Sequence, residues 1–333
     1  MIEYMKFTGP PCNGQKVSDK KTDMTFELPD KNNRVYIVSA DSYFGAHFAK
    51  YWLENGIEVH GCGCKDNLPD ELREIKYSKS DYSVWELCGL DYDWIMVCLD
   101  PTWKMDAYLS IIQSLCNYLE SNHISTHVCY LSSFRVCDSN SRHAILETSR
   151  LMPHSEYEMN IAAAELYLRM RSFQMNGRLP VRIVRMGEVY GNEFKSDGDH
   201  TCPGLINESL HQASVGEPVI MYGLGLKKWT VTHISDACRF SIKYMNLDCA
   251  PEIINVPGET LCVADVLMNI ARHFHADSVL ASASQNSVFC NKFAGDQVLS
   301  CKSARQLIAY EPQCRFRQWL ARQQSLMQVA TLA

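Results

Sequence analysis

The stretch RVYIVSADSYFGAHFAKYWLENGIEVHGCG, residues 34–63, decides the fold class. Its first part (34–40) is an apolar run typical of a buried strand, and its last part (57–63) is a second such run. Between them, residues 43–56 place apolar side chains at helical spacing and end at Gly56, a residue type that commonly closes helices. A strand, a helix and a second strand within about 30 residues are the unit that opens a doubly wound parallel sheet.

The same alternation continues along the chain. Apolar runs at 93–100, 126–133 and 180–186 predict further buried strands, because a strand that is covered on both faces is apolar on both. Longer amphipathic segments at 103–122 and 155–177 predict helices between these strands. We therefore predict an α/β fold with a Rossmann-like, doubly wound parallel sheet.

The regular alternation ends near residue 190, which divides the chain. Residues 1–33 are polar and of mixed charge, so we predict an N-terminal extension there. Residues 34–190 form the Rossmann-like domain in this interpretation. Shorter and more mixed patterns over 191–333 predict a smaller C-terminal mixed α/β lobe that is partly interleaved with the first domain.

Composition and charge narrow the classes of function. A net charge of −6 and a pI near 6.0 argue against a nucleic-acid-binding surface. The sequence has no apolar stretch of about 18 residues, which a membrane span needs, and its start lacks the apolar core of a secretory signal. Fifteen cysteines without the Cys/His spacing of a metal site predict free thiols in a reducing compartment. We expect a cytoplasmic protein that binds no metal.

Several short motifs follow one another in a familiar order, among them Gly45, a serine pair at 132–133, Tyr157 and RMGEVYGN at 185–192. With these motifs the sequence resembles the extended short-chain dehydrogenases/reductases over about residues 34–325. That family comprises NAD-dependent nucleotide-sugar epimerases, dehydratases and reductases. The spacing from the serine pair to Tyr157 is similar to the dTDP-4-dehydrorhamnose reductase branch. That branch includes the regulatory β subunit of methionine adenosyltransferase, which shares the Gly-Cys-Gly and basic ending of the second strand.

The resemblance places a phosphate-binding loop after the first strand. The family pattern there is GxxGxxG, whose glycines permit a tight turn and a close approach to the pyrophosphate. The three positions are Ser39, Ser42 and Gly45 in this chain. A Cβ atom at the first two positions crowds the pyrophosphate and disfavours a positive φ. The resemblance therefore implies a loop that is poorly suited to a dinucleotide.

The adenosine end differs from the family in the same way. An acidic residue ending the second strand would bind the ribose hydroxyls, but the sequence there reads Cys62-Gly63-Cys64-Lys65. Lys65 could meet a 2′-phosphate, which favours NADP over NAD. The family's aspartate that contacts adenine corresponds to Ser78.

The catalytic positions implied by the resemblance are mixed. Ser133 and Tyr157 correspond to the family's serine and its tyrosine general acid/base. The lysine four residues after the tyrosine, which lowers its pKa, is replaced by Ile161. Without that charge we expect Tyr157 to keep a phenol-like pKa near ~10 and to be a poor base at neutral pH. The Asp-Glu pair of the 4,6-dehydratases is replaced by Phe134 and Arg135.

Three residues correspond to the substrate-binding half of the family. Arg185 lies in the RMGEVYGN segment, and Asp236 ends the segment KKWTVTHISD. In that segment, Trp229 replaces the arginine that would contact a nucleotide-sugar diphosphate.

Four features that would bind the family's nicotinamide dinucleotide are altered together: the phosphate loop, the acid at the ribose, the contact with adenine and the lysine position. We therefore predict a non-catalytic pseudoenzyme that acts as a binding, regulatory or structural subunit without a cofactor. A divergent NAD(P)-dependent nucleotide-sugar epimerase or reductase is the alternative, supported by Ser133 and Tyr157. A second alternative is a cleft adapted to another nucleotide or a small metabolite.

The resemblance also implies partners. Extended members of the family dimerise through two long helices, which correspond to 103–122 and 155–176 here. We expect a homodimer through these helices, or a hetero-partner bound at the N-terminal extension or at the basic last helix.

Overall fold

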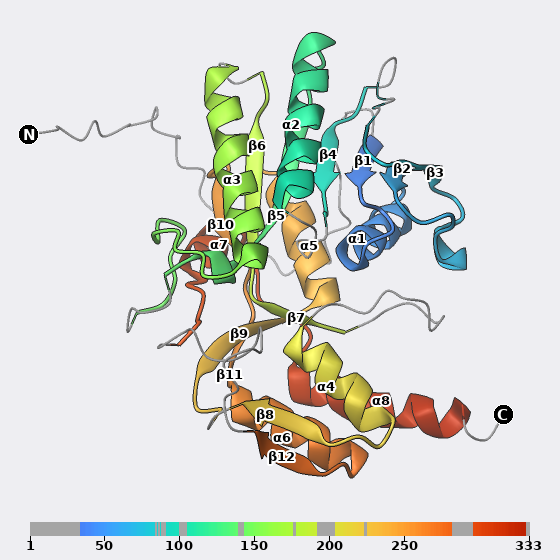
Figure 1. Cartoon of the computed structure of the whole chain (residues 1–333), viewed down its shortest axis with the longest axis vertical. Coiled ribbons are helices and arrows are strands. Elements are labelled where there is room, and N and C mark those ends of the chain that lie inside the picture. The colour runs from blue at the N-terminus through green and yellow to red at the C-terminus, as the bar shows by residue number, and fades with distance from the viewer. Residues whose placement is uncertain are drawn as a thin grey trace, which may run out of the picture.

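Figure 1 shows a computed structural model of the chain, which describes residues 34–330 apart from 84, 86, 88–90, 100–104, 139–142, 176–177, 192–203, 223–224 and 282–295. The extension predicted at 1–33 lies outside the described residues. A larger α/β body occupies the upper part of Figure 1, and a smaller lobe lies below it.

Seven parallel strands form the central sheet in the order β10-β6-β5-β4-β1-β2-β3. The strands are β1 (Arg34–Val38), β2 (Glu58–Gly63), β3 (Lys76–Lys79), β4 (Trp94–Val97), β5 (His127–Ser133), β6 (Val181–Met186) and β10 (Ile253–Asn255). The chain runs outward from β1 to β3, returns to β4 and continues to the opposite edge. Because the order reverses between β1 and β4, the crevice at the carboxyl ends of these strands is where such sheets bind ligands. The predicted fold class is confirmed.

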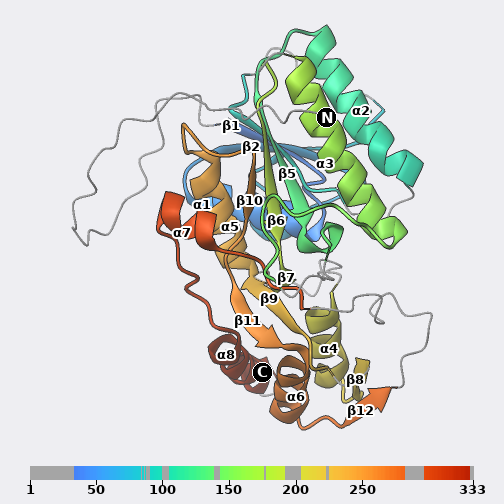
Figure 2. The same cartoon turned by 90° about the vertical axis from the view of Figure 1, so that its left-hand side faces the viewer.

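Helices cover both faces of this sheet (Figure 2). One face carries α1 (Tyr43–Glu54) and α5 (Ile234–Met245), which pack against each other, and the other carries α2 (Met105–Ser121) and α3 (Glu156–Gln174). Buried apolar side chains form a separate core on each face. The short helix α7 (Lys302–Ile308) contacts the edge strand β10. The helices predicted at 103–122 and 155–177 correspond to α2 and α3.

The smaller lobe has its own apolar core and two small sheets. Its elements are β7 (Glu188–Tyr190), α4 (Leu205–Ser214), β8 (Val219–Tyr222), β9 (Lys228–His233), β11 (Glu259–Cys262), α6 (Val263–Phe274), β12 (Ser278–Ala281) and α8 (Phe316–Ala330). The strand β7 precedes residue 191 but pairs with β9, whereas α5 and β10 follow residue 191 and belong to the larger body. The chain therefore crosses between the two parts more than once.

The described part of the chain contains no helix with the length and hydropathy of a membrane span. Within the same residues, no group of three or more His, Cys, Asp or Glu side chains is arranged to hold a metal ion.

Candidate functional site

The loop between β1 and α1 keeps the turn of a glycine-rich loop, although serines replace its first two glycines. Ser39 has φ 61°, in the left-handed region that glycine normally occupies. The sequence-based argument that serine disfavours this conformation therefore does not decide the geometry here. Ser42 caps α1, since its Oγ accepts the N–H of Gly45 at 3.0 Å. A Cβ atom at Gly45 would lie 2.0 Å from the Ser39 carbonyl oxygen, so close helix–strand packing requires this glycine.

The Ser39 side chain is held at the floor of the crevice. Its Oγ lies 2.6 Å from the hydroxyl of Tyr82, which follows β3, and both residues are buried. Burial raises the pKa of Tyr82 far above its ordinary value, so the phenol stays protonated. A ligand that reaches Ser39 from the carboxyl end of β1 has to exchange for this hydrogen bond.

The residues after β2 surround an aspartate that comes from the loop. Asp41 Oδ2 accepts the backbone N–H groups of Cys64 at 2.7 Å and Lys65 at 2.8 Å. Lys65 is half-buried, and Ser78 is exposed on β3, next to Cys62 of β2 in the sheet register. Of the predicted cofactor residues, Lys65 is thus bonded through its backbone to the carboxylate of Asp41, which was not among them, whereas Ser39 is bonded to Tyr82 and Ser78 lies on the neighbouring strand β3.

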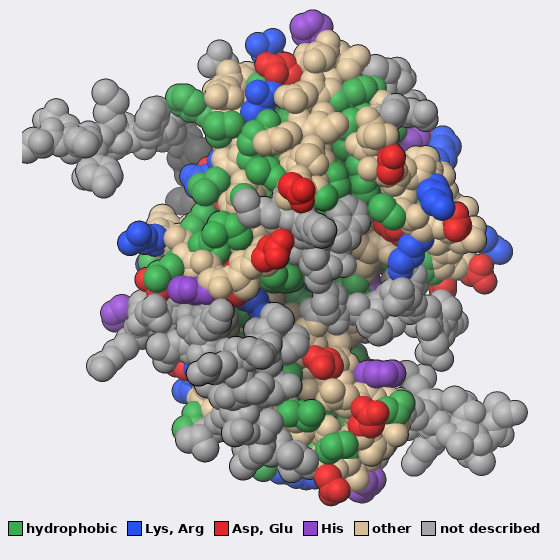
Figure 3. All heavy atoms as spheres, in the orientation of Figure 1, with side chains coloured by type: hydrophobic (Ala, Val, Ile, Leu, Met, Phe, Trp, Pro, Cys, Tyr) green, Lys and Arg blue, Asp and Glu red, His purple; other side chains and the backbone are tan. Residues whose placement is uncertain are grey.

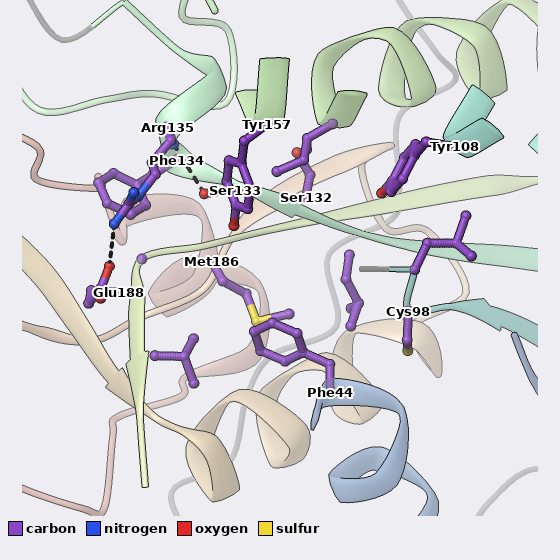
Figure 4. Close-up of a pocket in the computed structure, with 15 residues that line it drawn as sticks. Phe44, Cys98, Tyr108, Ser132, Ser133, Phe134, Arg135, Tyr157, Met186 and Glu188 are labelled. Atoms are coloured by element: carbon purple, nitrogen blue, oxygen red, sulfur yellow. Dashed lines mark hydrogen bonds and ion pairs between the residues drawn. The ribbon is translucent and has the colours of Figure 1, made fainter. Parts of the chain in front are cut away.

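A pocket opens at the carboxyl ends of β4, β5 and β6, beside the start of α3 (Figure 4). Residues of six different segments line it: Phe44, Cys98, Leu99, Tyr108, Leu131, Ser132, Ser133, Phe134, Arg135, Tyr157, Ile161, Met186, Gly187, Glu188 and Val189. The structure therefore brings the predicted catalytic pair, Ser133 and Tyr157, into one pocket together with Ile161.

Ser133 and Tyr157 are positioned by the ends of their own elements. Ser133 ends β5 and caps the short 3-10 helix η2 (Phe134–Val136), where its Oγ accepts the N–H of Arg135 at 3.3 Å. Tyr157 lies in the first turn of α3, whose N-cap residue Ser155 accepts the N–H of Glu158 at 3.2 Å. The Glu158 carboxylate in turn accepts the N–H of His154 at 2.6 Å. The side chains of Ser155 and Glu158 thus both cap the start of α3. The two hydroxyl-bearing side chains face the same space in Figure 4.

The positive charge of this pocket comes from a different place than in the family pattern. Ile161, one turn after Tyr157, is 3% exposed and belongs to the apolar core beneath the pocket. Among the described residues that line the pocket, Arg135 carries the permanent positive charge, and it forms a 2.9 Å ion pair with buried Glu188. Burial alone would lower the pKa of Arg135, but the charges of Glu188 and Tyr157 outweigh it and raise this pKa. Arg135 is therefore electrostatically coupled to Tyr157.

Arg185 lies beneath the pocket and does not line it. Its side chain is 2% exposed and pairs with the fully buried carboxylate of Glu165, and it also donates to the Glu147 carbonyl oxygen at 2.9 Å. Glu165 accepts a further hydrogen bond from Ser132 Oγ at 2.9 Å. The contacts of this predicted substrate residue thus support the end of β5.

The other two predicted substrate residues are also buried away from the pocket. Trp229 lies on β9 in the core of the smaller lobe. Asp236 is fully buried, accepts the N–H groups of Gln313 and Cys314, and pairs with Arg239 at 2.8 Å. Burial alone would raise its pKa, but these donors lower it below its usual value, so Asp236 is ionised and fastens the segment before α8.

Sequence reasoning missed Asp41, Arg135 and Glu188 as residues of the crevice. Arg135 and Glu188 are 53 positions apart and meet only because β5 and β6 are neighbours. A usable signal was present for Arg135, since a charged residue directly after an apolar strand of a parallel sheet lies at its ligand-binding edge.

The seven-stranded parallel sheet, the loop before α1 and a pocket with serine and tyrosine hydroxyls define a Rossmann-like protein of the short-chain dehydrogenase/reductase type. The sequence model of the NAD dependent epimerase/dehydratase family matches residues 35–256. The chain belongs to this family.

Individual relatives are more distant. A UDP-N-acetyl-alpha-D-glucosaminuronate decarboxylase of Bacillus cytotoxicus is 30% identical over 116 residues, 34% of this chain and 35% of the relative. The chain thus aligns with about a third of that protein's length. Among solved structures, a dTDP-glucose 4,6-dehydratase of Streptomyces venezuelae with NAD and TYD bound has a TM-score of 0.72 at 19% identity, covering 87% of this chain and 95% of the other. A UDP-glucuronic acid 4-epimerase of Bacillus cereus in complex with UDP-glucuronic acid and NAD has a TM-score of 0.69 at 17% identity, covering 86% and 96%.

These findings correct the function predicted from the sequence. A non-catalytic subunit without a cofactor is the wrong expectation, because the chain belongs to a family of NAD-dependent epimerases and dehydratases and its named relatives are enzymes. The replacement of a family residue does not by itself show that its function is lost, because a neighbouring residue in the folded chain can take over its role. The assignment to the dTDP-4-dehydrorhamnose reductase branch stays a prediction.

Proposed function

We propose that the protein is an NAD(P)-dependent enzyme that acts on a nucleotide sugar, in the class of the epimerases, dehydratases, decarboxylases and reductases. The observation that carries this proposal is the pocket in which Ser133 and Tyr157 face one space at the carboxyl ends of β4 to β6. Family membership and the enzymes among its relatives support it.

The residues present fit a nicotinamide dinucleotide. The positive φ of Ser39 keeps the turn of the loop, and Gly45 keeps α1 close enough for its N-terminal N–H groups to face a phosphate. The loop at 39–45 and the first turn of α1 would hold the pyrophosphate, with the Ser39–Tyr82 hydrogen bond exchanged on binding. A bound nicotinamide supplies hydride transfer, and the sugar would lie in the pocket beside Ser133 and Tyr157.

In this proposal, Tyr157 exchanges a proton with a hydroxyl group of the sugar, and the Ser133 hydroxyl orients the same oxygen atom. Ile161 supplies no positive charge, so the ionised phenol is favoured by Arg135 instead. Glu188 partly neutralises Arg135, and we expect weaker stabilisation of the phenolate than a free cation would give. Turnover should therefore increase as the pH rises from 7 to about 9.

The test combines cofactor binding with turnover. Calorimetry with NAD and NADP, and NMR of a panel of UDP- and dTDP-hexoses and hexuronates after incubation, would show binding and conversion. Tyr157→Phe should reduce turnover by about 100-fold or more, because it removes the hydroxyl group that exchanges the proton without removing the ring. The control is Tyr167→Phe, which removes a hydroxyl from the same helix outside the pocket. The proposal is overturned if the wild-type protein neither binds NAD or NADP nor converts any of these nucleotide sugars.

We propose further that the protein is a homodimer through α2 and α3. The supporting observation is a row of exposed apolar side chains on α3: Met159, Leu166, Met170 and Phe173. Apolar side chains are visible over α2 and α3 in the upper half of Figure 3.

The described cysteines are all free, which supports a reducing, cytoplasmic location.

A further inference from the structure

The carboxylate of Asp41 stands where a family member would begin its ribose-binding side chain. In dinucleotide-binding sheets, an acidic residue at the end of the second strand binds the adenosine ribose. That position is Gly63 here, and a Cβ atom built on it would lie 2.0 Å from Asp41 Oδ1. The three atoms nearest to this Cβ all belong to the Asp41 carboxyl group. The strand end therefore lacks a side chain, but the space beside it contains an acid.

The geometry of Asp41 leaves one oxygen atom for a ligand. Oδ2 accepts two backbone N–H groups, from Cys64 and Lys65, which hold the carboxylate in place. No described residue gives a hydrogen bond to Oδ1. Asp41 is 6% exposed, so its charge is poorly screened by water. A pair of adjacent ribose hydroxyls offers the donors that such an oxygen lacks.

The same charge separates the two nicotinamide nucleotides. NADP carries a phosphate on the 2′ oxygen of this ribose. A buried carboxylate beside it would repel the phosphate and would lose the hydrogen bond that the 2′-hydroxyl group donates. The predicted preference for NADP rested on Lys65, but Asp41 accepts the backbone N–H of this residue at 2.8 Å, so a carboxylate lies at the same strand end.

We propose that Asp41 binds the adenosine ribose and selects NAD over NADP, in place of the acid that Gly63 lacks. The inference rests on the proposed NAD(P)-dependent function. It assigns cofactor choice to a residue of the phosphate-binding loop instead of the second strand.

The test moves the carboxylate from position 41 to position 63. Dissociation constants for NAD and NADP are measured by calorimetry for the wild-type protein, Asp41→Ala, Gly63→Asp and the double variant. The φ of Gly63 lies outside the left-handed region, so removing the Asp41 carboxylate makes room for a side chain there. Asp66→Ala is the control, because Asp66 is a nearby exposed acid that pairs with Lys79. Melting temperatures check that each variant is folded.

We expect the wild-type protein to bind NAD at least about tenfold more tightly than NADP. Asp41→Ala should weaken NAD binding by about 10- to 100-fold, which corresponds to the loss of hydrogen bonds to a charged group. Gly63→Asp alone should also weaken it, because two carboxylates compete for one space, whereas the double variant should recover most of the affinity. The Asp66 control should bind both nucleotides as the wild-type protein does.

The outcomes separate the inference from the proposed function. Wild-type protein that binds neither nucleotide overturns the proposed function and the inference with it. Wild-type protein that binds NADP as tightly as NAD, or an Asp41→Ala variant with unchanged NAD affinity, overturns the inference alone. So does a folded double variant that binds NAD no better than Asp41→Ala.

Discussion

Replacing Arg185 by methionine tests whether this residue supports the fold or binds the substrate. The change removes the guanidinium but keeps much of the apolar side-chain volume. Both partners of the Arg185–Glu165 pair are almost completely buried, at 2% and 0% exposure. Without Arg185, the Glu165 carboxylate would keep the hydrogen bond from Ser132 Oγ at 2.9 Å as its remaining side-chain contact among the described residues.

The expected loss is large because one partner of a buried pair is left uncompensated. Breaking such a pair from one side typically costs about 3–5 kcal/mol. At about 2 °C per kcal/mol for a chain of this size, the melting temperature should fall by roughly 6–10 °C. Because Ser132 lines the pocket and is bound to Glu165, turnover should also decrease at temperatures well below the melting point.

The assay is thermal unfolding followed by circular dichroism, with Arg169→Met as the matched control. Arg169 pairs with Glu252 at 2.9 Å, but both side chains are about 40% exposed, so this pair contributes at most about 1 kcal/mol. Replacing Arg185 and Glu165 together should recover part of the stability. The reasoning is refuted if Arg185→Met melts no lower than the control yet loses affinity for a nucleotide sugar.

Two further predictions concern pH and assembly. Burial lowers the pKa of His233 to about 4 from an ordinary 6.5, so the stability of its neutral form is complete above pH 6.5 and is lost as the pH falls toward 4. The melting temperature of the wild-type protein should therefore fall more over this range than that of His233→Asn. The difference should correspond to at most about 3 kcal/mol. Equal pH profiles of the two proteins would contradict the lowered pKa of His233. Phe173, 82% exposed on α3, should be part of the dimer contact, so Phe173→Asp should give a monomer in light scattering. The exposed Val215→Asp in the smaller lobe should not change the mass, and a wild-type monomer would end the dimer proposal.

The fold could be predicted because its signals are local. The apolar runs and helical spacing over residues 34–63 correspond to β1, α1 and β2, and the two long amphipathic segments correspond to α2 and α3. Each strand of such a sheet is buried on both faces and is therefore apolar by itself. The predicted fold class would be the same if any one of these motifs were absent.

The ligand site could be predicted only in part. Ser133, Tyr157 and Ile161, whose order and spacing the resemblance fixes, line one pocket in the structure. Comparison with the family motifs links each function to one position in the sequence, so a replaced residue at that position predicts a lost function. In the folded chain a side chain from any nearby element can bring a charge to the same place, and Arg135 lines the pocket together with Tyr157.

The sequence by itself determined the parallel sheet, its helical layers and the two hydroxyl-bearing residues of the pocket. Only the tertiary structure decided which charges surround them. Asp41 meets the end of β2 from 22 positions earlier in the chain, and Arg135 meets Glu188 across neighbouring strands. Such contacts join residues that are far apart along the chain, and hydrophobic periodicity describes only near neighbours. The same physical reason explains why Arg185 and Asp236, which look like ligand residues in sequence, are fully engaged inside the protein.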